Sequence, residues 1–108
     1  MTPVLVLVTA SSAEEAARIG RAVVEQGLAA CANIVPGITS IYRWQGKVEE
    51  ASEHLLLLKS SRENWEALQA AIQELHSYEC PEIVAIEPDA IAPAYAAWWR
   101  ESLKEPLK

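Results

Sequence analysis

The sequence predicts an α+β fold, a ferredoxin-like sandwich in which two helices cover one face of a four-stranded antiparallel sheet. Apolar runs typical of strands alternate with helical stripes in the order β-α-β-β-α-β-α. One stretch, residues 30–47, is long enough for an exceptional strand with a tight turn at its end. The 108 residues, 51% of them hydrophobic, form one domain (1–108) that needs no disulfide to hold a core.

The first strand and helix follow directly from the N-terminal pattern. Residues 3–9 contain the run Val-Leu-Val-Leu-Val, which lacks polar alternation, so both faces of this strand must be covered. Two overlapping capping boxes, which begin at Ser11 and Ser12, open a helix expected over residues 12–28. We expect this helix to carry Glu15 outward with its other charged side chains.

The long strand, ACANIVPGITSIYRWQGK, dominates the prediction. If straight it would extend roughly 50 Å, whereas a compact domain of ~100 residues has a radius of gyration of only ~13 Å. Pro36-Gly37 marks a bulge or bend, because proline cannot donate to the ladder and glycine tolerates positive φ. Gln45-Gly46 closes a hairpin that must project from its own subunit. Apolar groups on both faces of such a ribbon predict that another chain covers it.

The chain is expected to return over residues 48–60, which are acidic at first and then apolar on both faces as Leu55-Leu56-Leu57-Leu58. A further capping box, Ser60-x-x-Glu63, opens a second helix expected over residues 61–76. The return strand therefore leads straight into the helix that packs beneath it.

A fourth strand is expected over residues 82–87, where Pro88 stops it, and a closing helix over residues 94–103. Three strands are thus apolar on both faces, yet two helices cover only one face of a sheet. The closing helix is too short to cover the other. A partner subunit is expected to do so.

Charge and hydropathy narrow the classes of partner. Nine Lys and Arg against 15 Asp and Glu give a formal net charge of −6, and the basic residues form no cluster. This pattern disfavours nucleic acid and anionic membranes as partners, because a protein binds either of them by neutralising phosphate charges with Lys and Arg. The apolar run at residues 4–8 is too short to span a membrane and follows no basic residue of the kind that begins a signal peptide. We therefore expect a cytoplasmic location.

Catalysis has no signature in this sequence. It contains no GxSxG, HExxH, glycine-rich phosphate loop or paired aspartates, and the presence of cysteine and two histidines does not by itself make a catalytic dyad. We expect neither an enzyme nor an organic cofactor.

Three segments carry a family resemblance: LAACANIVPGITSIYRWQGKVEE at residues 28–50, HSYECPEI at residues 76–83, and the pair Tyr95 and Trp98. They resemble the CutA family, the divalent-cation tolerance proteins, from about Val4 to Trp99. The resemblance implies a ferredoxin-like subunit in a tight homotrimer, in which long hairpins wrap neighbouring subunits. It also implies a role in the response to divalent metals, above all copper.

Candidate metal ligands are thiols and an imidazole, which select copper or zinc over magnesium or calcium. His76, Glu79 and Cys80 fall within five residues, although Cys80 stands where the family commonly has an aliphatic residue. Alternatively, His76 caps the helix C-terminus and Cys80 is a small buried hydrophobe. Cys31 is either an inert packed thiol or, as the family association with copper implies, a ligand. We predict that a soft-metal site, for copper ahead of zinc, involves Cys31, His76 or Cys80.

A second class of function remains open, a trimeric small-molecule sensor or scaffold that uses clefts between subunits as PII-like trimers do, an analogy of fold only. An organic anion would then bind near Arg43, Lys47 or Lys59. Trp44, near the hairpin turn, is the expected interface anchor, unless it packs within its own subunit. The candidate cleft and interface residues are Tyr42, Arg43, Trp44, Lys59, Tyr78, Glu79 and Glu82.

Overall fold

The computed structural model describes residues 1–105, and its elements follow the predicted β-α-β-β-α-β-α order. A short 3₁₀ turn, Arg62–Asn64, precedes the second α-helix. The elements are β1 (Pro3–Ala10), α1 (Ala13–Glu25), β2 (Cys31–Trp44), β3 (Lys47–Ser61), α2 (Trp65–Leu75), β4 (Ile83–Ile86) and α3 (Pro93–Glu101).

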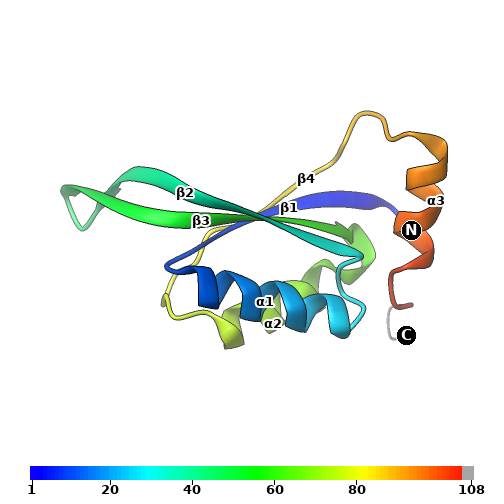
Figure 1. The fold of residues 1–108 in the computed structure, drawn as a ribbon, viewed down its shortest axis with the longest axis horizontal. Coiled ribbons are helices and arrows are strands. Elements are labelled where there is room, and N and C mark those ends of the chain that lie inside the picture. The colour runs from blue at the N-terminus through cyan, green and yellow to red at the C-terminus, as the bar shows by residue number, and fades with distance from the viewer. Residues whose placement is uncertain (106–108) are drawn as a thin grey trace.

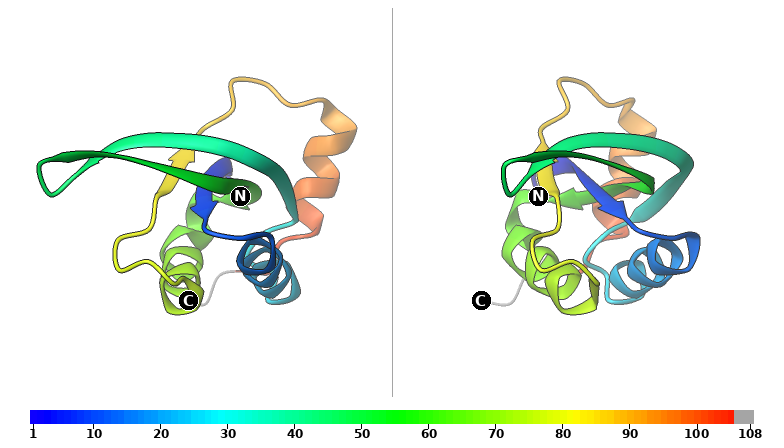
Figure 2. Two further views of the ribbon diagram at one scale, coloured as in Figure 1. Left: turned by 60° about the vertical axis from the view of Figure 1, so that its left-hand side comes forward. Right: turned by 90° about the vertical axis from the view of Figure 1, so that its left-hand side faces the viewer.

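The four strands form one antiparallel sheet in the order β2-β3-β1-β4, which confirms the predicted ferredoxin-like arrangement. Helices α1 and α2 lie side by side against one face of the sheet, and α3 stands at one end (Figure 1). The two views of Figure 2 show the same layering. Alternate side chains of β1 and β3, including Val6, Val8, Leu56 and Leu58, are fully buried between the sheet and these two helices.

Within residues 1–105, the opposite face of the sheet is not covered by α1 or α2, and α3 packs only at one end of it, against β1 (Figure 1), so we call it the open face. Leu5, Leu7 and Leu57 on this face stay partly exposed, and Val84 and Ile86 of β4 are 46% and 48% exposed. The prediction that two helices cover only one apolar face is therefore confirmed. No helix in this part of the chain is long and apolar enough to cross a membrane.

The β2–β3 hairpin makes the molecule elongated, 43 Å along its longest axis against 27 and 24 Å across. The hairpin reaches past the body of the domain at the left of Figure 1. The pairing of β2 with β3 shifts register between Val35 and Ile38, which confirms the predicted bulge at Pro36-Gly37. Gln45 and Gly46 both adopt positive φ, 50° and 79°. Positive φ at both central residues is what a two-residue hairpin turn needs in order to match the twist of its two strands.

The start of α1 differs from the prediction in the role of Glu15. Ser12 caps the helix and accepts a hydrogen bond from the Glu15 N–H at 3.1 Å. The Glu15 side chain, however, is not turned outward, because the residue is only 3% exposed. Its carboxylate accepts hydrogen bonds from the backbone and hydroxyl of Ser11 and from the Ser77 N–H at 2.7 Å. A carboxylate with three donors is stable in a buried position, and this one joins the start of α1 to the loop after α2.

The start of the second helix also differs from the prediction. Ser60 does not cap it, because its buried hydroxyl donates to the Leu28 carbonyl at 2.7 Å. Ser61 caps the 3₁₀ turn instead, accepting from the Asn64 N–H at 3.2 Å. β3 thus runs one residue farther than expected, and its last side chains close the core.

The Glu15 carboxylate should make folding stability depend on acid. Burial raises the pKa of Glu15, but hydrogen bonds from Ser77 and Ser11 lower it by more, to about 2 against an ordinary 4.5. A depressed native-state pKa adds stability above pH ~4.5 that is lost as the pH falls toward 2. Glu15→Gln should therefore lower the free energy of unfolding by up to ~3 kcal/mol at neutral pH, and by roughly half as much near pH 3.

Urea unfolding at fixed protein concentration, followed by tryptophan fluorescence across this pH range, measures the difference. Glu14→Gln is the matched control, because Glu14 is an exposed carboxylate in the same helical turn. A difference that stayed constant from neutral pH to pH ~3 would contradict the proposed linkage.

Candidate functional site

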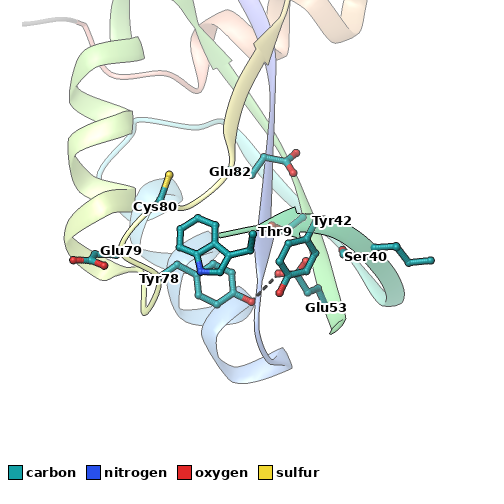
Figure 3. A pocket seen from close by; sticks show the side chains of 10 residues that line it. Thr9, Ser40, Tyr42, Glu53, Tyr78, Glu79, Cys80 and Glu82 are labelled. Atoms are coloured by element: carbon teal, nitrogen blue, oxygen red, sulfur yellow. Dashed lines mark hydrogen bonds between the residues drawn. The ribbon is translucent and has the colours of Figure 1, made fainter. Parts of the chain in front are cut away.

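The open face carries a hollow of about 710 Å³, bounded by the hairpin and by the loop between α2 and β4. Figure 3 shows its side chains, which come from β1, from both strands of the hairpin and from residues 78–82. The lining residues are Thr9, Ser40, Ile41, Tyr42, Trp44, Glu53, Tyr78, Glu79, Cys80 and Glu82.

The bulge in β2 decides which hairpin side chains lie on the side of the hollow. Before the bulge, Val35 pairs with Leu55; after it, Ile38 pairs with Glu53, so β2 has gained one residue. One extra residue reverses the alternation of a strand. The even-numbered residues of β2, including Tyr42 and Trp44, therefore share a side with Glu53.

Glu53 and Tyr78 form the innermost polar pair of the hollow. Glu53 is only 6% exposed, and its Oε2 accepts the Tyr78 hydroxyl at 2.7 Å (Figure 3). No Lys, Arg or His among residues 1–105 forms an ion pair with Glu53. Burial raises the pKa of Tyr78, and the hydrogen bond to Glu53 together with the negative charges of Glu53 and Glu15 raises it further. Tyr78 therefore remains a neutral donor.

His76 holds the loop that carries Tyr78. Its Nε2 lies 2.7 Å from the Thr9 carbonyl, and its Nδ1 accepts the Tyr78 N–H at 3.1 Å. A carbonyl only accepts and an N–H only donates, so these contacts select the neutral tautomer with its proton on Nε2. Both ring nitrogens thus bind backbone groups. His76 could ligate a metal only if one of these hydrogen bonds broke.

Comparison with known proteins identifies the family. Residues 4–102 match the family described as CutA1 divalent ion tolerance protein. The chain belongs to the CutA1 family. A divalent-cation tolerance protein CutA from Thermus thermophilus is 48% identical over 98 residues, which cover 91% of this chain and 95% of that relative. Mouse protein CutA is 43% identical over 84% of this chain, which spans about half (51%) of the mouse protein.

Solved CutA1 structures confirm the fold. The Cut A1 structure from Thermus thermophilus aligns with a TM-score of 0.92 at 46% identity and covers 94% of this chain and 99% of that one. CutA1 from Oryza sativa aligns with a TM-score of 0.94 at 34% identity, over 97% and 96% of the two chains. These alignments confirm the resemblance that the sequence motifs carry.

The structure separates the three metal-ligand candidates. Cys31 lies partly exposed on β2, where the Lys59 ammonium is 3.7 Å from its sulfur and also contacts the Asn33 side chain. Cys80 lies in the loop before β4 and is exposed, so the alternative of a small buried hydrophobe was wrong. His76 is the C-cap residue of α2, where its backbone N–H donates to the Ile72 carbonyl, but its buried ring bonds to β1. Among residues 1–105, no three His, Cys, Asp or Glu side chains are grouped to hold a metal ion.

The hollow gathers most of the cleft residues that the sequence singled out, together with Cys80. Arg43 and Lys59 do not line it. Sequence reasoning missed Thr9, Ser40, Ile41 and Glu53. Of these, only Glu53 could have been noticed in the sequence, because it is the last acidic residue before the apolar half of its strand. The predicted residues that line the hollow are Tyr42, Trp44, Tyr78, Glu79 and Glu82.

Tyr78→Phe should destabilise the fold, because it leaves the buried Glu53 carboxylate without its hydroxyl donor. The expected loss in the free energy of unfolding is ~1–3 kcal/mol. Chemical denaturation monitored by circular dichroism measures it. Tyr95→Phe is the control, because Tyr95 is 40% exposed on α3. Equal losses for the two variants would show that the Tyr78 hydroxyl contributes nothing specific.

Proposed function

We propose that this chain is a non-enzymatic, cytoplasmic protein of divalent-metal tolerance that binds divalent cations, copper above all, and acts as a homotrimer. The observation that carries the proposal is membership of the CutA1 family over residues 4–102. Relatives from Thermus thermophilus and Pectobacterium atrosepticum are named divalent-cation tolerance proteins.

The open face supports assembly. Val84 and Ile86 on β4 are each about half exposed within a single chain, and Leu5, Leu7 and Leu57 of the same face stay partly exposed. Such apolar groups over a large part of one face are typical of a surface that another subunit covers. Closed rotational symmetry would also cover the free edges of the sheet. The number three comes from the CutA resemblance.

Sedimentation equilibrium tests the assembly. We expect a mass three times that of the 11.9 kDa chain at micromolar concentration. Val84→Glu should lower that mass, because a buried unpaired charge opposes association. Val24→Glu is the matched control, since Val24 is 38% exposed on α1, outside the open face. A single-chain mass for the unsubstituted protein would refute assembly, and a two-chain mass would refute the trimer.

A copper titration tests the metal site. We expect Cu(I) binding, measured against a competing chelator, to fall in Cys31→Ser, because the partly exposed sulfur is a soft ligand of the kind that selects copper and a hydroxyl is not. Cys80→Ser is measured in parallel, since the two thiols lie on separate elements. His76→Ala requires a circular-dichroism control, because the imidazole holds the loop. An unchanged stoichiometry in all three variants would exclude these residues as ligands.

A second function, a small-molecule sensor that uses clefts of the assembly, is favoured by one observation. The hollow has a volume typical of small-molecule sites and contains five of the seven predicted cleft residues. An organic anion near Arg43, Lys47 or Lys59 was the expected ligand, but none of these cations lines the hollow. The sensor role therefore needs a ligand of different charge.

A further inference from the structure

We propose that the hollow on the open face binds a small organic ammonium cation, through the buried Glu53 carboxylate and the aromatic rings around it. The inference deepens the second proposed function, the small-molecule sensor, and rests on it. Its argument uses neither Cys31 nor His76, which lie outside the hollow; of the candidate copper ligands only Cys80 lines it.

The first argument is the unpaired charge of Glu53. Glu53 as a residue is only 6% exposed, and acidic side chains in such buried positions are normally paired with a cation. Glu53 has one hydrogen bond, from the Tyr78 hydroxyl to Oε2, and no ion pair with any residue of the described chain. The side chain lines the hollow, so a ligand there could supply the missing positive charge.

The second argument is the aromatic wall. Tyr42, Trp44 and Tyr78 all line the hollow, and Figure 3 shows Tyr42 and Tyr78 gathered about Glu53. Tyr42 and Trp44 remain 43% and 48% exposed, so both rings can reach a ligand. The faces of aromatic rings attract cations, and cages of such rings recognise quaternary and methylated ammonium groups.

The third argument concerns the other ligand classes. Glu79 and Glu82 add two further carboxylates to the lining, while no Lys or Arg from the described part of the chain contributes to it. This charge repels an organic anion. The carboxylates of residues 1–105 also do not group in threes to hold a metal ion. A cation with an apolar outer surface satisfies both the carboxylates and the rings.

Isothermal titration of the assembled protein with choline tests the proposal. Its neutral isostere, 3,3-dimethylbutan-1-ol, has the same shape without the charge. We expect choline to bind at least about tenfold more tightly than the isostere, since both a charge pair and cation–π attraction are lost in the neutral compound. Citrate, titrated in parallel, probes the binding of an organic anion.

Two substitutions assign the binding to the hollow. Glu53→Gln should weaken choline binding about tenfold, yet its amide oxygen can still accept the Tyr78 hydroxyl and so preserve the fold. Tyr42→Leu, at an exposed position, should weaken binding about threefold or more. The matched controls are Glu50→Gln, an exposed carboxylate on the same strand, and Tyr95→Leu, an exposed tyrosine on α3. Both controls should bind choline as the unsubstituted protein does.

The alternative outcomes overturn the inference in distinguishable ways. Equal binding of choline and its isostere, or unchanged choline affinity in Glu53→Gln and Tyr42→Leu, overturns the ammonium site. Binding of citrate in place of choline overturns the ligand class but keeps the sensor role. The absence of binding by all three compounds overturns both, and is the result expected if a basic side chain of a second copy already fills the hollow.

Discussion

A single extra residue in β2 determines how this chain presents its long hairpin. At Pro36-Gly37 the strand gains one residue against β3, and Gly37 takes a positive φ of 68°. The alternation of β2 is therefore opposite on the two sides of the bulge. Before the bulge, the odd-numbered Cys31 and its strand partner Lys59 lie on the open face. After the bulge, the even-numbered Tyr42 lies on that face. Without the bulge, Ile41 and Arg43 would take the side of Glu53, and the hollow would lose two of its aromatic rings.

The other wall of the hollow depends on a chain of buried and partly buried hydrogen bonds. Glu15 at the start of α1 accepts from Ser77; His76 joins Thr9 on β1 to the Tyr78 backbone; and the Tyr78 hydroxyl reaches Glu53 on β3. Several elements are thus tied to one short loop. These directed hydrogen bonds fix the position of the loop. The same bonds occupy both nitrogens of His76, the residue that the sequence most readily suggests as a metal ligand.

Sequence patterns predicted the elements well because each one has a local cause. Capping serines, the Pro-Gly interruption and the Gln-Gly turn act within a few residues, so the order of strands and helices and the projecting hairpin followed from them. The errors arose where a side chain is satisfied from a distance. Glu15 was expected outside because its donor Ser77 lies 62 positions away. Glu53 resembled its exposed acidic neighbours, since nothing near it in the sequence announces Tyr78 as its partner. Polar contacts between residues far apart in the chain produce no periodic pattern in the sequence, and such contacts position the residues of the site.

The open face divides into two regions with different chemistry, and this division reconciles the two proposed roles. Around β4 it is aliphatic, with Val84 and Ile86 half exposed, and aliphatic surface of this kind is stabilised by burial against another copy. Toward the hairpin it is acidic and aromatic, and Glu53 there is a buried residue without an ion-pair partner in the described chain. A subunit that covered only the aliphatic region would leave the hollow at the edge of the contact, where assembly would further desolvate its carboxylates and strengthen their attraction for a cation. Association and cation binding would then be coupled, each favouring the other by the same factor.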